Sequence, residues 1–535
     1  LMKRLRIWRK RRKIWRILIM RKFSARNLFN LSHENKLTCE MGKLVPILCE
    51  EILPGDTFRV STDMVVRMAP MLAPIMHNVN VYTHFFFVPN RLIFDKWEDF
   101  ITGGKNGDDA TVAPYITTPS GGFSVGSLAD YLGVPTGVAG VQVSALPFRA
   151  YNKIYNDYYR DENLQSEIAL STGAGSDTTT VTDLQTRCWQ HDFFTSALPW
   201  TQRSNTGAVK VPLGGTAPVV YQAASDNSLY YKNSSSNADW SGKGVRVNGP
   251  SSGNMVGNSL YSSTPFTSGS TAYGTGGADL VVDLSDAAGG DINDIRYAFQ
   301  VQRFLEKMAR GGARYTEVIL SHFGVRSSDA RLQRAEYLGG GRSPVAISDV
   351  LQTSADDNQP TPLATMAGHG YSAQRSHQFK RFFEEHGFLI GIMSIMPRST
   401  YQQGLAKKWT RETRFSYYWP VFSHLGEQAI HNREIYLQGT SDDGGIFGYQ
   451  PRYEEYRKHY SEVHGDFRDS LDFWHLGRIF TQLPVLNEDF VKCDPDNRIF
   501  AVQSDVDHLW VDVYHNIKAL RPVPKYGDPG YIDHD

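Results

Sequence analysis

Three consecutive stretches decide the fold class: LVPILCEEILPGDTF (44–58), RVSTDMVVRM (59–68) and VNVYTHFFFVPNRLIF (79–94). Apolar and polar residues alternate in them, and β-branched and aromatic residues are enriched, which is typical of strands. Pro54, Gly55 and Asp56 form a turn signal between two of these strands. The stretches therefore predict paired strands of a hairpin or sandwich.

Four later stretches have the same character: RSPVAISDVLQ (342–352), HGFLIGIMSIMP (386–397), RFSYYWPVF (414–422) and DHLWVDVYHNIKAL (507–520). Helical spacing is found in two other places, residues 148–164 and residues 291–323, and in the second Gly311 and Gly312 interrupt the pattern. The 47 glycines and 25 prolines favour turns and long connections over a helical bundle. We expect a mainly β chain with helical insertions.

The composition excludes several classes of protein. Of the 535 residues, 41% are hydrophobic, and the 28 Phe, 27 Tyr and 10 Trp allow a large core, so the chain as a whole is not disordered. The four cysteines form no CxxC pair, which predicts reduced thiols and neither a zinc ribbon nor a disulfide scaffold. The 16 histidines show no metal-ligand spacing, so we expect no metal and no cofactor.

Charge is segregated along the chain although the net charge is zero. The first 33 residues hold 12 Lys or Arg and no acidic residue, which leaves a net charge of −12 on the remainder. Residues 1–22 have the pattern of a basic amphipathic helix, and Arg9, Lys10, Arg11, Arg12 and Lys13 are candidate nucleic-acid contacts. Because Met2 and Met20 could both start translation, an upstream extension is the alternative interpretation. Without an apolar run of membrane-spanning length, we expect no stable membrane insertion.

Residues 201–290 differ from the rest in composition. Gly, Ser, Thr and Asn make up 43 of these 90 residues and only 10 are charged, so the segment cannot pack a large core of its own. It is expected to be a long surface insertion, with aromatic residues as its anchors. The expected anchors are Tyr221, Tyr230, Tyr231, Trp240, Tyr261, Phe266 and Tyr273.

Two further motifs bear on catalysis. Gly122, Ser124 and Gly126 spell the GxSxG of serine hydrolases, but turn-forming residues precede it instead of a buried strand, so an exposed loop is favoured. The acidic pairs Glu384–Glu385 and Glu454–Glu455 are expected on a solvated face. No complete catalytic constellation is found, and we expect no enzyme.

A cluster of cations and aromatic residues follows residue 406. Lys407, Lys408, Trp409 and Arg411 are candidate nucleic-acid contacts, because cations can track a phosphate backbone while aromatic rings stack on bases. The aromatic residues that follow, up to Trp419, extend the pattern. The alternative is a strand whose rings are in the core and whose cations reach the surface.

Blocks of sequence throughout the chain resemble the major capsid proteins of gokushovirus-type microviruses, small icosahedral bacteriophages with single-stranded circular DNA. The blocks include NLSHENKLTCEMGKLVPI (30–47), FFVPNRLIFDKWEDFITGG (86–104), LPFRAYNKIYNDYYRDENL (146–164), ARGGARYTEVILSHFGVRSSDARLQRAEYLGG (309–340), YYWPVFSHLGEQ (417–428) and ALRPVPKYGDPGYIDH (519–534). They keep their order from residue 30 onward. Residues 1–21 have no counterpart in this pattern.

The resemblance implies an eight-stranded antiparallel jelly roll with large insertions and a structural, non-enzymatic role. Residues 1–29 would be a basic arm, 30–200 and 291–535 the jelly-roll domain, and 201–290 a protrusion at the threefold axes that carries host attachment. The protein would form a T=1 icosahedral shell of itself around circular single-stranded DNA. Further implied partners are a small basic DNA-binding protein, an internal scaffolding protein, a pilot protein and a host surface receptor.

The resemblance also implies localisation to the virion after assembly in the host bacterial cytoplasm. Two rival classes remain at this point. A carbohydrate-binding β-sandwich would also be rich in Tyr and Trp, but it would be expected as a small module. A serine hydrolase would rest on the GxSxG motif alone.

Overall fold

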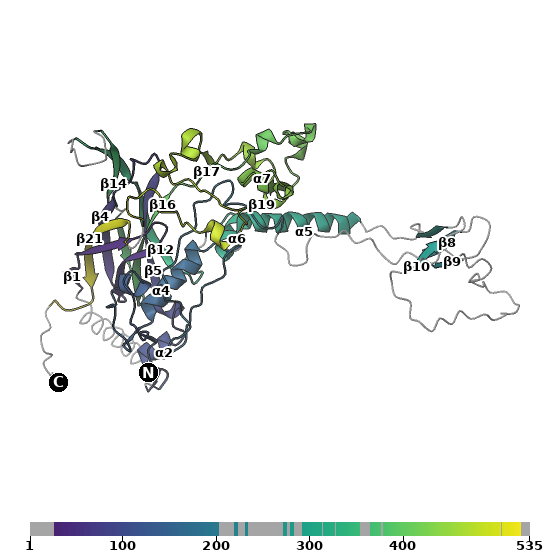
Figure 1. Ribbon diagram of the computed structural model, residues 1–535. Helices are drawn as coiled ribbons and strands as arrows, with labels where there is room; N and C mark the ends of the chain where they lie inside the picture. The colour runs from purple at the N-terminus through teal and green to yellow at the C-terminus, as the bar shows by residue number, and fades with distance from the viewer. Residues whose placement is uncertain are drawn as a thin grey trace, which may run out of the picture. The chain divides into compact units, whose positions relative to one another are not determined.

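The computed structural model (Figure 1) describes most of the chain outside the two ends and the insertion. The described residues are 26–106, 108–202, 292–312, 314–326, 328–353, 364–375, 378–503 and 506–525, with four short strands between 219 and 282. Two compact units are present: unit 1 comprises Leu1–Arg203 and Glu306–Asp535, and unit 2 comprises Ser204–Leu305.

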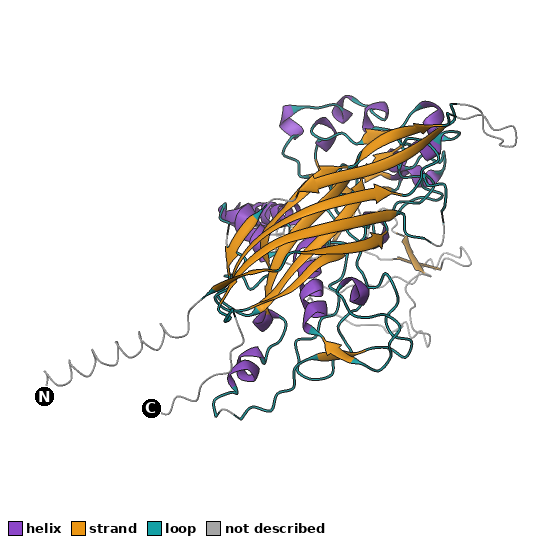
Figure 2. Cartoon of the chain, turned by 90° about the vertical axis from the view of Figure 1, so that its left-hand side faces the viewer, coloured by secondary structure: helices purple, strands orange, loops and turns teal. Residues whose placement is uncertain are grey.

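Unit 1 contains two large antiparallel sheets. The first has seven strands, in the order β1-β21-β4-β14-β13, with β2 also paired to β21 and β15 also paired to β4. Its strands are β1 (Asn27–Asn30), β2 (His33–Cys39), β4 (Thr57–Met68), β13 (Ala346–Leu351), β14 (Met366–Arg375), β15 (Phe379–Phe382) and β21 (Leu509–Arg521). In Figure 2 the long strands lie side by side along the length of the unit.

The second sheet has four strands, in the order β12-β5-β16-β3. They are β3 (Val45–Ile52), β5 (Val79–Pro89), β12 (Glu336–Pro344) and β16 (Gly387–Pro397). The strands expected at 44–58, 59–68 and 79–94 are therefore present, but they do not pair with one another as a hairpin: β3 pairs with β16, β5 with β12 and β16, and β4 with β14, β15 and β21. For example, Leu509 of β21 lies opposite Met68 of β4.

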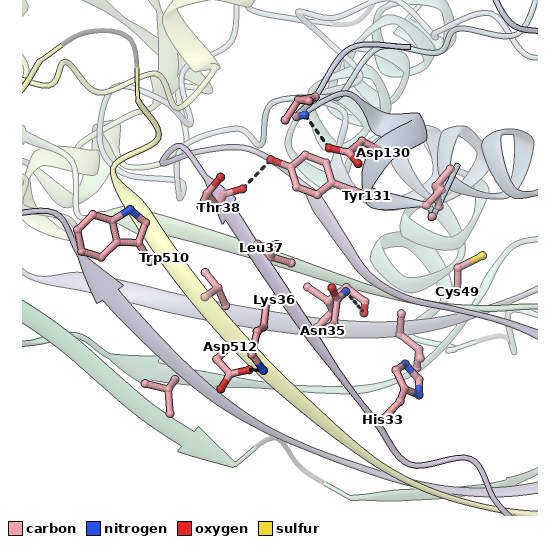
Figure 3. A pocket seen from close by; sticks show the side chains of 18 of the residues that line it. His33, Asn35, Lys36, Leu37, Thr38, Cys49, Asp130, Tyr131, Trp510 and Asp512 are labelled. Carbon is pink, nitrogen blue, oxygen red and sulfur yellow. Dashed lines mark hydrogen bonds and ion pairs between the residues drawn. The ribbon is translucent and has the colours of Figure 1, made fainter. Parts of the chain in front are cut away.

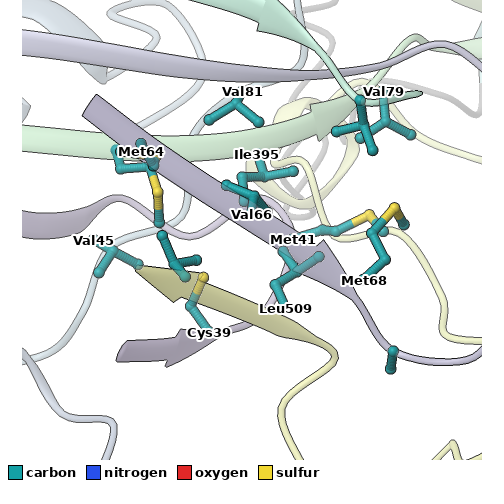
Figure 4. Close-up of a cluster of buried hydrophobic side chains, with 14 of the residues drawn as sticks. Cys39, Met41, Val45, Met64, Val66, Met68, Val79, Val81, Ile395 and Leu509 are labelled. Atoms are coloured by element: carbon teal, nitrogen blue, oxygen red, sulfur yellow. The ribbon is translucent and has the colours of Figure 1, made fainter. Parts of the chain in front are cut away.

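The main core lies where side chains of the two sheets meet. Met64 and Val66 of β4 pack in one cluster with Val81 of β5, Ile395 of β16 and Leu509 of β21 (Figure 4). Strand β21 shows why the sequence forms this layer: its residues alternate between buried and exposed over eleven positions, which places one apolar face against the opposite sheet. A mainly β chain is thus confirmed.

Helices cover the other face of the second sheet. The helix expected at 148–164 is present with different ends: helix α4 (Leu146–Ile154) continues into a five-residue π-helix, η2 (Tyr155–Tyr159). Phe148 and Tyr151 of α4 pack in one cluster with Phe86 of β5 and Ile390 of β16. The last two of the three tyrosines in η2, Tyr158 and Tyr159, lie with their ring centres 4.9 and 6.0 Å from that of Phe86 in β5.

The helices at the end of the insertion also match the expectation. Helix α5 (Ile292–Gly311) and helix α6 (Tyr315–Phe323) are separated at Gly312, which has a positive φ of 88° that favours glycine. In the part of the chain that the structure describes, no helix is long and apolar enough to cross a membrane.

Shorter elements fill the connections. They are α2 (Trp97–Thr102), α3 (Leu128–Tyr131), β6 (Tyr115–Thr117), β7 (Gln142–Ser144), β17 (Thr400–Tyr401), β18 (Glu427–His431), α7 (Asn432–Ile435), β19 (Ile446–Pro451), β20 (Ser461–Glu462) and α8 (Glu488–Val491), besides several 3-10 turns. The connection between β16 and β21 has its own small core, which includes Phe194, Tyr401, Ile430 and Phe447.

The prediction of a strand at RFSYYWPVF (414–422) is wrong. The segment forms two 3-10 turns, η4 (Arg414–Ser416) and η5 (Pro420–Phe422). The backbone N–H of Thr413 donates to Ser416 Oγ at 3.4 Å, and proline begins η5. Local side-chain hydrogen bonds and a missing N–H both compete with strand pairing, and they prevail over the β propensity of the aromatic residues.

The described part of unit 2 consists of two strand pairs and of α5 as far as Leu305. Strand β8 (Val219–Gln222) pairs with β11 (Asp279–Val282), and β9 (Tyr230–Asn233) pairs with β10 (Thr271–Gly274). Both pairs join the beginning of the insertion to its end.

Candidate functional site

The cationic segment, Lys407–Arg411, lies in the connection between β16 and β21, and its first three residues form the 3-10 turn η3 (Lys407–Trp409). Lys407 Nζ donates to the carbonyl oxygen of Ala429 at 3.0 Å and lies 3.6 Å from Glu434 Oε1. Burial raises the pKa of Glu434, and the Lys407 charge opposes that shift. The charge of Lys407 is therefore engaged within the chain.

Arg411 is engaged in the same way. Its guanidinium lies 3.5 Å from Glu455 Oε1 and 4.6 Å from the ring centre of Tyr456, and both ion-paired side chains are nearly buried. Glu454 is buried as well and pairs with Arg457 at 2.7 Å. The solvated face expected for Glu454–Glu455 is thus wrong, because cations from neighbouring turns compensate both carboxylates.

Lys408 and Trp409 are the exposed members of the cationic segment. Trp409 is 72% exposed, and Lys408 Nζ lies 5.7 Å from its ring centre. Both residues border a hollow of about 760 Å³ that Gln402 and Glu434 also line. The Gln402 Oε1 and Glu434 Oε2 atoms are buried and accept no hydrogen bond from the described residues. Of the four predicted contacts in this segment, these two side chains remain accessible to a ligand.

An apolar surface, here named the aromatic ridge, continues from this segment. It consists of the exposed residues Phe415, Tyr417, Tyr418, Trp419, Val421 and Leu425. Hydrogen bonds fix its backbone: Trp419 Nε1 donates to the carbonyl oxygen of Arg414 at 2.8 Å, and the Tyr453 hydroxyl donates to that of Tyr417 at 3.2 Å. Exposed apolar side chains that follow one another so closely along the chain are typical of a binding face.

A second hollow, here named the Arg187 pocket, lies beside the second sheet and encloses about 630 Å³. Its lining residues are His84, Phe86, Tyr158, Tyr159, Arg187, Cys188, Trp189, Gln190, His191 and Tyr337. Strands β5 and β12, the π-helix η2 and the loop 187–191 contribute them. Sequence reasoning missed this set, since residues up to 253 positions apart meet there and only the Tyr158–Tyr159 pair is visible as a local pattern.

A third hollow, a groove of about 930 Å³, runs along β2 between β21 and α3 (Figure 3). Lys36 Nζ lies 2.7 Å from Glu34 Oε2 and 3.2 Å from Asp512 Oδ1, and these contacts raise its pKa. The Tyr131 hydroxyl donates to the carbonyl oxygen of Thr38 at 2.7 Å. In Figure 3 the Lys36 and Asp512 charges compensate each other, and the Asp130 carboxylate accepts a hydrogen bond of 2.9 Å from the Gly126 backbone N–H.

The GxSxG serine lies in a loop. Ser124 is exposed, Gly122 and Gly126 have φ of 71° and 74°, and α3 begins four residues later. The four cysteines are unpaired. Burial raises the pKa of Cys49 and Cys188 to about 12, which disfavours the nucleophilic thiolate.

Several predicted site residues cannot be placed. Arg9, Lys10, Arg11, Arg12, Lys13, Trp240, Tyr261 and Phe266 lie outside the described residues. Tyr221 lies in β8, Tyr230 and Tyr231 in β9, and Tyr273 in β10. Tyr231 and Tyr273 are directly opposite each other in the β9–β10 register.

Comparison with known proteins gives a consistent result. The family described as "Capsid protein (F protein)" matches residues 20–531. Capsid protein VP1 of Bdellovibrio phage phiMH2K is 40% identical over 95% of both chains. Capsid protein VP1 of Chlamydia phage 1 is 38% identical over 94% of this chain and 95% of its own length, and that of Spiroplasma virus 4 is 33% identical over the same shares.

These matches extend over both sheets and over the connections that carry the cationic segment, the aromatic ridge and the Arg187 pocket. The chain therefore belongs to the capsid protein (F protein) family, among the gokushovirus-type microviruses, and is a structural capsid protein of the virion.

Proposed function

We propose that this chain is the only shell-forming subunit of a T=1 icosahedral capsid that encloses circular single-stranded DNA, and that its insertion, residues 201–290, mediates host attachment. The observation that carries the proposal is the order of strands in the two sheets. The family assignment gives the structural role, and the strand order, the exposed surfaces and the charge distribution support the finer statements.

The strand order supports an eight-stranded jelly roll. One sheet contains β2-β21-β4-β14 and the other contains β3-β16-β5-β12. Along the chain these eight strands alternate between the sheets, from β2 to β5 and again through β12, β14, β16 and β21. That alternation, with two sheets face to face, is the pattern of the jelly rolls of viral capsids.

The aromatic ridge supports self-association. It presents four aromatic and two aliphatic side chains to solvent on a backbone fixed by hydrogen bonds. Aromatic residues and arginine are enriched at protein interfaces, and Arg414 lies 4.7 Å from the ring centre of Phe415 within the ridge. We infer that a second copy of the chain covers the ridge, because a closed shell buries most lateral surface of its subunits against identical copies.

The charge distribution of the chain supports a DNA-binding role that is divided among the basic arm, a separate small basic protein and the body of the chain. Outside its first 33 residues the chain has a net charge of −12, so its body repels a polyanion on average. We propose that the cations of the basic arm, Arg9–Lys13, and a separate small basic protein neutralise most phosphates. In the body, Lys408 and Trp409 would add weak contacts, since Lys407 and Arg411 are already paired with carboxylates.

The DNA contacts of the cationic segment can be tested in particles. We expect the double substitution Lys408→Ala and Trp409→Ala to lower particle stability at raised salt, because phosphate binding falls with salt and depends on the number of cations. Lys518→Ala, an exposed lysine on β21, is the matched control. Unchanged DNA content and stability in particles of the double variant would show that Lys408 and Trp409 do not contact the DNA.

The composition of the insertion supports an exposed protrusion. Because Gly, Ser, Thr and Asn make up 43 of its 90 residues, the segment 201–290 has little apolar surface to bury, so aromatic residues such as Trp240 and Tyr261 would anchor it to copies of itself. Deletion of residues 225–275 should leave unit 1 folded and should abolish adsorption to the host. If particles with this deletion assemble and adsorb normally, the insertion has no role in host attachment and is only a spacer.

Co-expression with the neighbouring phage genes, including the internal scaffolding protein, tests the shell itself. We expect the chain to sediment as one large, uniform particle, whereas monomers or small oligomers under these conditions would contradict the proposal. A pilot protein could be recovered with the particles, but its absence would not change the outcome of this test.

A further inference from the structure

The Arg187 pocket combines aromatic rings in an arrangement suited to a planar ligand. Tyr158 and Phe86 have ring centres 4.9 Å apart, and Tyr337 lies 5.5 Å from Phe86. His84 Nδ1 and the Tyr159 hydroxyl share a hydrogen bond of 2.7 Å, which fixes two of the rings. Tyr337 is 47% exposed and stands at the open side of the pocket.

The π-helix η2 is part of this arrangement. Helix α4 widens into a π-helix over Tyr155–Tyr159, and Tyr158 and Tyr159 project from its last two positions into the pocket lining. The Tyr158 hydroxyl donates to the carbonyl oxygen of Ala335 at 2.5 Å, next to β12. Helices with π geometry are rare and are frequently found at functional sites.

The charge of the pocket is positive. Arg187 donates to Ser394 Oγ at 2.8 Å and lies 4.5 Å from the ring centre of Tyr82, but no carboxylate among the described residues pairs with it. Arg342 lies 5.9 Å from the same ring and likewise has no carboxylate partner among these residues. The lining residues include no Asp or Glu.

His84 does not offset this charge. Burial, followed by the positive charge of Arg187, lowers the pKa of His84 to about 4. The imidazole is therefore neutral near pH 7, and the guanidinium of Arg187 is the charged group that lines the pocket. A partly buried guanidinium without a carboxylate favours an anionic ligand.

We propose that the Arg187 pocket binds one nucleotide of the packaged single-stranded DNA, with the base against Tyr158 and Tyr337 and the phosphate at Arg187. This inference rests on the proposed enclosure of DNA. A nucleotide joins a planar ring to an anion, which matches the two features of the pocket, and about 630 Å³ is within the range of small-ligand sites. Stacking on aromatic rings accepts every base, as packaging of a whole genome requires.

Photo-crosslinking inside assembled particles tests the position of the DNA. Particles are produced with single-stranded DNA that carries 5-iododeoxyuridine, irradiated, digested and analysed by mass spectrometry. The expected result is a cross-link to the peptides that contain Tyr337 or Tyr158. Cross-links only outside the pocket, for example to Trp409, would overturn the proposal, as would occupation of the pocket by a peptide of another phage protein.

Two substitutions measure the contribution of the pocket. Arg187→Gln and Tyr337→Ala should each weaken binding of a short oligo-dT to the full chain by about five- to tenfold. Tyr337 is half exposed, so this variant keeps the test valid if Arg187→Gln fails to fold. Arg375→Gln, an exposed arginine on β14 that pairs with Asp63, is the control and should bind like the wild type.

Sedimentation of the same preparations separates this proposal from the proposed function. Wild-type affinity in both variants, in chains that still form shells, would overturn the nucleotide site and leave the capsid role intact. If the wild-type chain forms no shells with its phage partners, the proposed function is wrong, and the measured affinity for oligo-dT does not change that result.

Discussion

Among single residues, the ion pair of Arg149 and Asp177 shows how the insertions are tied to the sheets. Both side chains are buried, and the guanidinium lies 2.7 Å from Asp177 Oδ2. Arg149 also donates to the carbonyl oxygens of Ile93 and Gly173, at 2.9 and 3.0 Å. Burial alone would raise the pKa of Asp177, but hydrogen bonds from Thr180 and from Arg149 outweigh it and lower the pKa.

Asp177→Asn should therefore destabilise the chain strongly, because it leaves the Arg149 guanidinium buried without its counter-charge. We expect the free energy of unfolding to fall by about 3–5 kcal/mol in denaturant titrations. Asp63→Asn, which breaks the exposed pair with Arg375, should cost less than about 1 kcal/mol. Equal losses in the two variants would contradict the structural role of the buried pair.

Acid sensitivity should arise partly from His515, which lies in the core of the first sheet. Its Nδ1 is 2.9 Å from Thr62 Oγ1 and its Nε2 is 2.9 Å from the carbonyl oxygen of Ile47. Burial lowers the pKa of His515 to about 4. Because the unfolded histidine titrates near 6.5, the unfolded state binds the proton first, and the stability due to His515 is lost as the pH falls from about 6.5 towards 4.

We expect this residue to account for about 2 kcal/mol of the loss in unfolding free energy between pH 7 and pH 5. Denaturant titrations of the wild type and of His515→Gln at both pH values measure it. The variant should be less stable at pH 7 and should depend less on pH. An identical pH dependence in the two proteins would contradict a neutral buried His515.

At the scale of elements, β21 shows how far local pattern predicts structure. Its alternating residues predicted a strand at 507–520, and Leu509–Arg521 forms one at the centre of the first sheet. The apolar run at 386–397 likewise became β16. In both cases the signal is a long stretch of sequence whose pattern of apolar residues fits only a strand.

Elements without such a local signal were missed or misassigned. Gly339, Gly340 and Gly341 gave no strand signal, but they lie in β12, where a side chain at Gly340 would collide with the Thr83 backbone of β5. The carboxylate partners of Lys407 and Arg411 lie 27 and 44 residues further along the chain. Contacts of this kind depend on tertiary structure, so the cationic segment was predictable as a pattern but its internal pairing was not.

Ile517→Ala should test the position of β21 in the core. Ile517 is fully buried in a cluster with Phe58, Phe85 and Leu389, so the truncation should lower the free energy of unfolding by about 2–5 kcal/mol. Lys518→Ala, at the next and exposed position, should change it by less than about 0.5 kcal/mol. A small loss for Ile517→Ala would contradict the register of this strand.

At the scale of the whole molecule, the aromatic ridge should decide whether subunits associate. Val421 and Leu425 are 82% and 62% exposed, so Val421→Asp with Leu425→Asp should leave the folded subunit intact. In a shell the new carboxylates would be buried without partners, which costs several kcal/mol at each contact. We expect soluble subunits with native circular dichroism and no particles.

Val125→Asp is the matched control for the aromatic ridge. Val125 is 83% exposed and lies in a loop that is distant in sequence from the ridge. This variant should assemble with the yield of the wild type. Particles of normal yield from the Val421→Asp and Leu425→Asp chain would show that the ridge is not covered by a second copy.

The central claim is that copies of this one chain close into a T=1 shell. The mass of DNA-free particles from co-expression, measured by native mass spectrometry together with particle images, tests it most directly. We predict closed icosahedral particles in which this chain occurs in the copy number of a T=1 shell. Open sheets, filaments, a larger triangulation number or a second shell-forming subunit would contradict the account.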